Sequence, residues 1–205
     1  KLSGTVQSAM IAAEDFPGRV HVVDSRSVAI GSGILAQYAL TLVDQGMDAA
    51  SIAEQLMAER DNIHLIALLD TLEYLKKGGR ISKTVAFAGN LLSIKPVVCL
   101  DGGEVKILGK ARGSRQGNNL LIQEIQSGGV DYSRPVLLGY TGLEDSLLQK
   151  YIQDSASLWD GKLEQLPATM IGSTVGTHVG PGAIAVAFFG AAAGAFILGP
   201  DEGTK

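Results

Sequence analysis

The first 69 residues alternate between segments typical of helices and short apolar runs typical of strands, and this alternation constrains the fold most strongly. Apolar residues recur at helical spacing in 4–14, 34–44 and 48–61, whereas 19–24 (RVHVVD) and 63–69 (IHLIALL) are compact apolar runs. A chain that alternates helices with strands is typical of α/β folds with parallel strand pairing. We therefore predict an α/β fold with a Rossmann-like, parallel-sheet lobe at the front.

A second sheet is expected in the remainder of the chain. Strands are predicted at 63–69, 94–100, 105–108, 135–140, 162–166 and 183–189, with helices at 71–77, 82–92, 117–126 and 143–155. The turn Asp101-Gly102-Gly103 is a hairpin signal, so this sheet must be at least partly antiparallel. We predict a second α/β lobe with a mixed six-stranded sheet.

These patterns divide the chain into 1–62, the front lobe, 63–190, the second lobe, and 191–205, an unassigned tail. The front lobe has too few strands, because a sheet of one or two strands buries little apolar surface and leaves its edges open. We therefore expect the opening strands of this lobe to be absent from the chain.

Composition and motifs exclude several functions. The net charge is −4, which argues against nucleic-acid binding. The lone Cys99 excludes a disulfide within the chain and a multi-cysteine metal site, fits a small buried hydrophobe, and is compatible with a reducing, cytoplasmic location. No P-loop, HExxH, Cys/His cluster or GxSxG motif is present, so we predict no metal, no cofactor and no catalytic residue.

Glycine is over-represented, with 26 residues in 205, and glycines gather beside polar residues in two segments. In 2–9 (LSGTVQSA), Ser3 is placed to cap a helix, and the Gly4 and Thr5 amides with the hydroxyls could bind an anion. In 171–182 (IGSTVGTHVGPG), a loop would present His178, which could hold an anion as imidazolium. The alternatives are an ordinary cap and a tight turn with a surface histidine; His21 and His64 lie in expected strands and are interpreted as structural.

A third segment, 106–115 (KILGKARGSR), is strongly basic. Lysines often protect the edge of a hairpin, so this segment could simply be solvated. Alternatively, Arg112 and Arg115 could contact a membrane surface, a partner protein or a phosphate.

Five stretches of this chain resemble the DegV family of bacterial fatty-acid-binding proteins, the lipid-carrying subunits of fatty acid kinase. They are LSGTVQSA at 2–9, 22–25 with Gly31-Ser32-Gly33, DTLEYLKKGGRIS at 70–82, LSIKP at 92–96 and GTHVGPGAIAVAFF at 176–189. The resemblance implies two α/β lobes with one long-chain fatty acid between them. It also implies that a separate kinase subunit phosphorylates the carboxylate in phospholipid metabolism, so that the carrier is not itself an enzyme.

The resemblance places the carboxylate-binding serine on Ser3, next to Gly4 and Thr5, and the carboxylate-binding histidine on His178. It implies a functional arginine after the hairpin, for which Arg112 and Arg115 remain alternatives. Apolar residues expected to line the acyl tail are Phe87, Leu91 and Ile94. The chain lacks the TSxP[ST]-like loop with which the family supplies a further carboxylate ligand.

The sequence therefore predicts a carrier that binds a long-chain fatty acid and presents its carboxylate to a kinase subunit. Two alternatives remain open at this point: a small-molecule kinase or transferase of related fold, and a lipid-sensing regulatory protein that contacts a membrane through residues 106–115.

Overall fold

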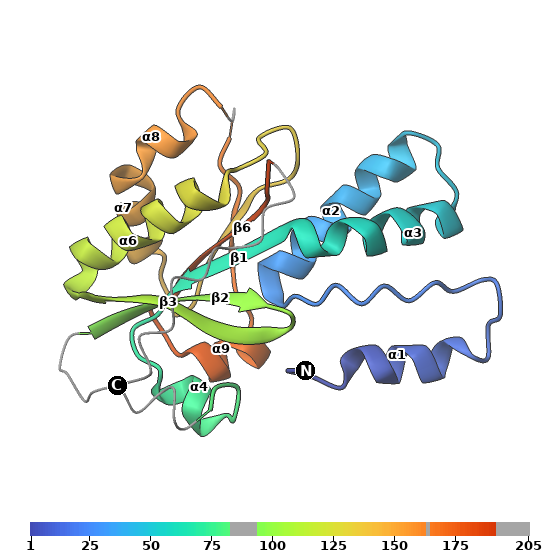
Figure 1. Cartoon of the computed structure of the whole chain (residues 1–205), viewed down its shortest axis with the longest axis horizontal. Coiled ribbons are helices and arrows are strands. Elements are labelled where there is room, and N and C mark those ends of the chain that lie inside the picture. Colours follow the sequence, from blue (N-terminus) through green and yellow to red (C-terminus); the bar gives the residue numbers. More distant parts are fainter. Residues whose placement is uncertain (83–93, 163–164, 192–205) are drawn as a thin grey trace, which may run out of the picture.

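A six-stranded mixed sheet forms the centre of the molecule (Figure 1), in a computed structural model that describes residues 1–82, 94–162 and 165–191. The strand order is β3-β2-β1-β6-β4-β5. Neighbouring strands are antiparallel except β4 and β5, which are parallel. The strands are β1 (Ile63–Leu68), β2 (Ile94–Asp101), β3 (Glu104–Arg112), β4 (Leu137–Tyr140), β5 (Ala168–Met170) and β6 (Ile184–Phe189). The predicted mixed six-stranded sheet is confirmed.

Helices lie on both faces of this sheet, α2 and α3 on one and α6, α7 and α8 on the other (Figure 1). Two short helices, α4 and α9, lie together at one end of the sheet, on the same side of the molecule as α1. The helices are α1 (Thr5–Ala13), α2 (Ala29–Asp44), α3 (Ala49–Glu59), the 3₁₀ turn η1 (Arg60–Asn62), α4 (Glu73–Lys77), α6 (Gly113–Gly128), α7 (Ser146–Asp154), α8 (Ala156–Trp159) and α9 (Ser173–Val179). In these helices, no segment is long and apolar enough to cross a membrane.

Strand β6 is buried along its whole length, which explains its uninterrupted apolar sequence. Ile184, Val186 and Phe188 face the core beneath α6 and α7. Alternate residues, from Ala185 to Phe189, face the core beneath α2. A strand covered on both faces needs apolar side chains at every position.

The hairpin between β2 and β3 forms where the sequence predicts it. Gly102 and Gly103 both adopt positive φ values, 55° and 77°, between the paired residues Asp101 and Glu104. Positive φ at both central residues is typical of the tight turns that match the right-handed twist of hairpin strands. Helix α3 likewise begins as expected, because the Asp48 carboxylate accepts hydrogen bonds from the amides of residues 50 and 51.

Three sequence-based expectations are wrong. Strand β1 pairs antiparallel with both β2 and β6, so the front alternation does not build a parallel sheet. Residues 19–24 form no strand, and Val20 is 47% exposed, because the described part of the chain provides no neighbour to accept their ladder hydrogen bonds. The fifth strand is Ala168–Met170, aligned by its parallel pairing with β4; the predicted span 162–166 precedes it and includes residues 163 and 164, which lie outside the described residues.

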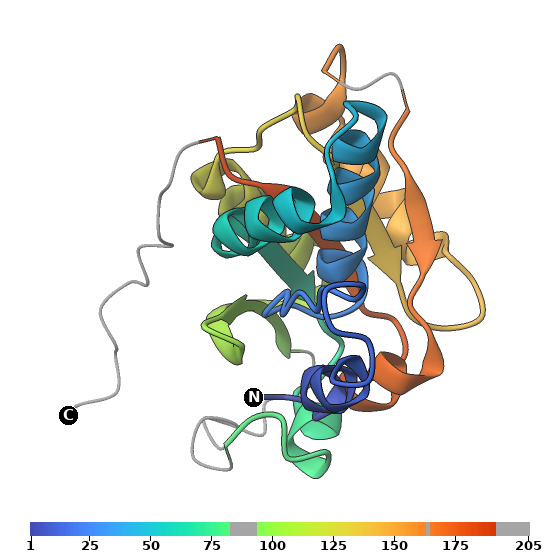
Figure 2. The ribbon, with the colours of Figure 1, turned by 90° about the vertical axis from the view of Figure 1, so that its right-hand side faces the viewer.

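The division of the chain at residue 62 remains a prediction. Helix α2 packs on β1, β4 and β6, and Ile34 and Leu35 are buried in that contact. In contrast, α1 has no buried residue and is joined to α2 by a long extended segment (Figure 1); in Figure 2, α1 lies below α2. This packing favours a boundary before α2. The predicted helix at 82–92, with Phe87 and Leu91, falls almost entirely outside the described residues.

Burial of His64 predicts a pH dependence of stability. The ring stacks on Phe188 with centroids 5.0 Å apart, and desolvation lowers the pKa of His64 in the folded chain. Unfolding lets this histidine take up a proton at its ordinary pKa of about 6.5, so the unfolded state binds more protons. We therefore expect the free energy of unfolding to fall as the pH is lowered from 7 to 5.

Urea unfolding at several pH values measures this dependence, and the His64→Gln variant should show a shallower slope than the native chain. An equal slope in both proteins would show that other groups cause the pH dependence.

Candidate functional site

The first residues of the chain form a small cluster of hydroxyl groups. Ser3 Oγ accepts a hydrogen bond from the Thr5 amide at 3.1 Å and lies 2.6 Å from Thr5 Oγ1. All three residues from Ser3 to Thr5 are exposed. The helix begins at Thr5 with Gly4 at the N-cap position, so Ser3 acts from one residue further out than predicted. The Thr5 amide is therefore not free for a ligand, in contrast to the sequence-based expectation.

Helix α4 is a short helix whose end is fixed by two glycines. Leu75 is buried in an apolar cluster with Val98 and Ala183, which ties the helix to the sheet. The helix ends at Gly78, and Gly79 follows with a φ of 69°. Such a positive φ after the last helical turn is the conformation that glycine favours. The predicted helix stop is confirmed.

His178 lies in the last turn of helix α9, not in an extended loop as the sequence suggests. Residues 173–179 form two helical turns, which end at Gly180 with a φ of 80°. The His178 ring is half-buried, and its Nδ1 is fully buried, with no hydrogen-bond partner among the residues that the structure describes.

Helices α4 and α9 interlock through two glycines. A Cβ atom on Gly78 would lie 2.2 Å from His178 Nδ1, and one on Gly180 would lie 2.4 Å from Tyr74 Cδ2. Each glycine therefore creates the space for a ring from the opposite helix. This reciprocal packing explains why both segments carry glycine at these positions and fixes the His178 ring against the backbone of 77–79.

Arg80 connects this interlock to the start of the chain. One guanidinium nitrogen donates to Gly78 O at 2.6 Å, and the other donates to Leu2 O at 3.2 Å. The N-terminus is held a second time where Lys1 Nζ pairs with Glu104 Oε1 at 3.1 Å, at the tip of the β2–β3 hairpin. The structure thus links Leu2 to Arg80, two residues beyond Gly78, on which His178 packs.

Thr141, at the end of β4, holds the loop that follows His178. Its hydroxyl donates to Gly180 O at 2.6 Å and accepts from the Ala183 amide at 2.9 Å. The Gly182 amide in turn donates to Thr141 O at 3.0 Å. Thr141 is only 4% exposed. These bonds fix the direction in which the chain leaves α9 and enters β6.

The other predicted residues that the structure describes lie at the end of the β2–β3 hairpin opposite its turn and at the start of α6. Arg112 is exposed at the end of β3, paired in register with the half-buried Ile94 at the start of β2. Arg115 is exposed in the first turn of α6. The pKa of the Asp154 carboxyl is lowered mainly by hydrogen bonds from Asn118 and Lys150, and the charge of Arg115 adds a smaller effect in the same direction. None of the described contacts connects either arginine to Ser3 or His178.

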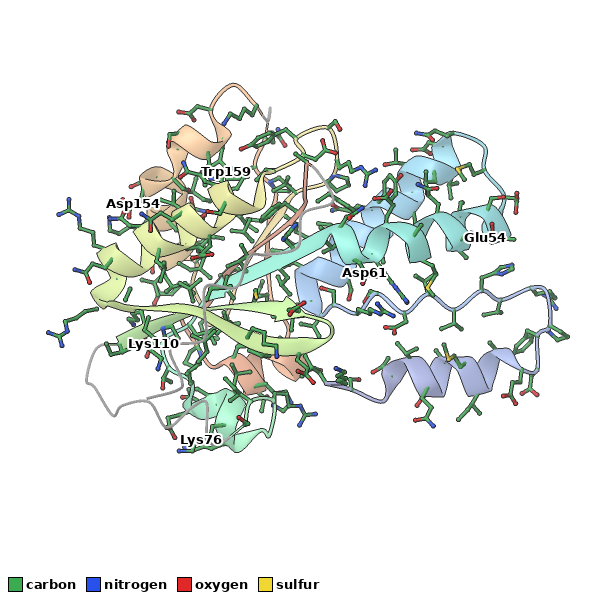
Figure 3. The ribbon with its side chains drawn as sticks, in the orientation of Figure 1. Glu54, Asp61, Lys76, Lys110, Asp154 and Trp159 are labelled. Carbon is green, nitrogen blue, oxygen red and sulfur yellow. The ribbon has the colours of Figure 1, made fainter. Side chains whose placement is uncertain are left out.

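Two surface cavities have neither Ser3 nor His178 among their lining residues. One, of about 510 Å³, is lined by α7 and α8 residues such as Trp159, and the other, of about 240 Å³, lies between the starts of α2 and α9. Within residues 1–82, 94–162 and 165–191, no group of three or more metal-ligating side chains could hold a metal ion. Figure 3 shows the charged side chains spread over the surface, from Glu54 on α3 to Lys76 on α4 and Lys110 on β3.

Comparison with known protein families shows to which family this chain belongs. The model of the DegV family matches residues 1–191. The chain belongs to the DegV family. It is 32% identical over 190 residues to a DegV domain-containing protein of Caldanaerobacter subterraneus and 35% identical over 192 residues to one of Deinococcus radiodurans. The matches cover 92% and 91% of this chain, but 67% and 66% of the relatives. The chain therefore spans about two thirds of the relatives' length.

Solved structures of DegV proteins have the same fold. A fatty-acid-binding DegV protein of Thermus thermophilus superimposes with a TM-score of 0.78 at 30% identity, over 92% of this chain and 67% of that one. A DegV protein of Eubacterium eligens loaded with heptadecanoic acid gives a TM-score of 0.78 at 23% identity, over 92% and 69%. The predicted DegV-like α/β fold is confirmed.

Sequence reasoning selected Ser3 and His178 but missed two residues that hold them in place. Arg80 and Thr141 contact residues 78 and 39 positions away along the chain. A helix-stop signal was visible before Arg80, but nothing in the sequence specified its acceptors. The position of Thr141 directly after a predicted strand was the one sequence signal that could have drawn attention to this residue.

Loss of the Thr141 hydroxyl should destabilise the chain. Thr141→Val leaves the Gly180 carbonyl and the Ala183 amide buried without this partner, so we expect the free energy of unfolding to fall by about 1–3 kcal/mol. Urea unfolding measures the change. The matched control is Thr177→Val, because the described hydrogen bond of the exposed Thr177 hydroxyl lies within α9. Equal losses in both variants would contradict the role assigned to Thr141.

A methyl group at Gly78 should displace His178. In Gly78→Ala the new Cβ would occupy the space of Nδ1, so we expect the imidazole NMR signals of His178 to shift. Gly176→Ala, on α9 itself, is the control, because its Cβ would meet only the Ile171 carbonyl oxygen at 4.0 Å. Unchanged His178 signals in the Gly78 variant would rule out the interlock.

Proposed function

We propose that this chain is the greater part of a carrier that binds one long-chain fatty acid, with the carboxylate held near Ser3 and His178. The observation that carries the proposal is that two contacts lie two residues apart in the chain. His178 packs on Gly78, and the Leu2 carbonyl accepts a hydrogen bond from Arg80. Hydroxyls from one segment and an imidazole from another can together satisfy a carboxylate, which needs several donors when it leaves water. The fatty-acid complexes of other DegV proteins support this proposal.

The ring geometry of His178 suits a donor role. Burial of Nδ1 against Gly78 leaves Nε2 as the nitrogen that can meet a ligand. A hydrogen bond from Nε2–H to a carboxylate is charge-assisted because the acceptor is ionised, and such bonds are about twice as strong as neutral ones. We place Gly4 beside this site because its open N-cap position lets a ligand approach the backbone.

The acyl tail would supply most of the affinity. Burying each CH₂ group contributes about 0.8 kcal/mol, so a chain of about 14 such groups contributes roughly 11 kcal/mol and offsets much of an association cost of about 4–15 kcal/mol. An apolar cluster adjoins the α4–α9 interlock, with Leu75 and Ala183 buried and Val105, Ile107 and Val179 half-buried. We propose that the tail runs along this cluster toward Ile94, and the lining roles of Phe87 and Leu91 remain predictions.

We further propose that the carrier acts in the cytoplasm and presents the carboxylate to a separate kinase subunit, which carries out the phosphoryl transfer. In this proposal the chain itself is not catalytic. Arg112 and Arg115 are exposed near the start of α6, and we propose them as contacts for that subunit or for a membrane surface.

Lipid extraction tests the binding function. The purified full-length protein should contain a long-chain fatty acid detectable by mass spectrometry, and it should bind added palmitate. His178→Ala should weaken palmitate binding about tenfold or more, which corresponds to the loss of one charge-assisted hydrogen bond. His21→Ala is the matched control, because His21 is an exposed histidine outside the site. A protein that neither contains nor takes up fatty acid would refute the proposal.

A further inference from the structure

Residues 3–23 form an arm that projects from the rest of the molecule (Figure 1). The arm contains α1, which has no buried residue, and residues 14–21 are all exposed. The chain then enters the core at α2, where Ile30 and Ile34 are buried. The change from an exposed segment to a buried one therefore takes place within residues 24–29.

The backbone of this short transition is strained. Among the described residues other than glycine, Arg26 and Ala29 are the two with a positive φ, 50° and 47°. Left-handed backbone brings Cβ too close to the following carbonyl oxygen, so residues with a side chain rarely adopt it. Such strain persists only where surrounding contacts enforce it, and it is common at segments that switch between conformations.

Charged contacts with the η1 turn enforce the strained conformation. Arg26 Nη1 donates to both carboxylate oxygens of Asp61 at 3.1 Å. In the reverse sense, Arg60 Nη1 donates to the Asp24 carbonyl oxygen at 2.9 Å and lies 3.9 Å from the Asp24 carboxylate. That carboxylate also accepts a hydrogen bond from the Arg26 amide at 3.0 Å. Loss of these contacts would let the backbone of 26–29 relax.

The η1 turn itself is firmly attached to the core. Glu59, directly before the turn, pairs with Arg134. The Arg134 guanidinium lies 5.0 Å from the centroid of the Tyr38 ring on α2 and 5.1 Å from that of Phe189 on β6. These contacts tie the turn to α2 and to the most buried strand. If the contacts of residues 24–26 with η1 break, the arm is therefore the part that moves.

We propose that residues 26–29 are a pivot with two positions, and that the charged contacts of residues 24–26 with η1 hold the arm closed against the backbone strain. Opening also breaks the contacts that Lys1 and Leu2 make with the core, and it moves Ser3 relative to the sheet. The inference goes beyond the proposed function, because the pivot and the contacts that close it are defined without a ligand.

Distances between two spin labels test the pivot. Cys99, the one cysteine of the chain, is buried, which raises the pKa of its thiol to about 12 and keeps it from reacting with the label. Labels at Ala12→Cys on α1 and Gln123→Cys on α6, both exposed positions, report where the arm lies. Asp61→Asn should raise the population of a second distance about two- to fivefold, the factor that corresponds to loss of one exposed ion pair.

Two controls distinguish movement of the arm from damage to the fold. Lys150→Gln removes an exposed ion pair within α7 and should leave the distance between labels at 12 and 123 unchanged. Labels at Gln37→Cys on α2 and at position 123 join two parts of the core, so their distance should stay constant in Asp61→Asn. A change in that core distance, or an unchanged arm distance in Asp61→Asn, would overturn the pivot.

Glycine at position 29 should have the opposite effect. Ala29→Gly relieves the strain of the closed position, so adding it to Asp61→Asn should lower the population of the second distance about five- to thirtyfold. A substitution that merely loosened the chain would raise this population, and that result would overturn the proposal. The measurements use no ligand, so their outcome is independent of whether the chain binds a fatty acid.

Discussion

The candidate site depends on close contact between two short helices, which only glycine permits. Gly78 accommodates the His178 ring, and Gly180 accommodates the Tyr74 ring. Neither α4 nor α9 exceeds seven residues, so neither would be stable alone. Their mutual contact, with Leu75 buried beneath, gives both helices a fixed place. The position of His178 therefore follows from packing rather than from hydrogen bonds to its ring.

This contact is connected directly to the most buried part of the molecule. The loop after α9 is held by Thr141 and then enters β6, whose six residues are all buried. Strand β6 has neighbours on both sides, β1 and β4, so it cannot shift without disrupting the sheet. A rigid strand immediately after the segment that carries His178 limits the movement of that segment. The start of the chain has no such support, because α1 has no buried residue. Among the described contacts, the bond from Arg80 to Leu2 and the ion pair of Lys1 with Glu104 connect it to the rest of the protein.

Whether the sequence predicts a structural feature depends on how far apart in the chain the interacting residues lie. The β2–β3 hairpin, the start of helix α3 and the apolar β6 strand depend on neighbouring residues or on apolar pattern, and each is predicted correctly. Residues 19–24 have the pattern of a strand, but a strand also needs a partner, which pattern alone does not reveal. Residues 173–179 contain glycine and β-branched residues, which disfavour a helix, yet contact with α4 overrides that preference. Arg80 and Thr141 act over long sequence separations, which only the folded chain defines.

The acyl tail and the carboxylate of a fatty acid would need different kinds of contact with this protein. Apolar burial grows with each CH₂ group and tolerates imprecise contacts, so a tail site can retain a ligand even when the head site is distorted. A carboxylate instead requires donors at hydrogen-bond distance in a defined direction. Ser3 and His178 come from opposite ends of the chain, so their separation can be held constant only by contacts between their segments. The bonds of Arg80 and the Gly78–His178 contact are such contacts. Retention of the lipid and presentation of its carboxylate would therefore depend on different residues, and each could change without loss of the other.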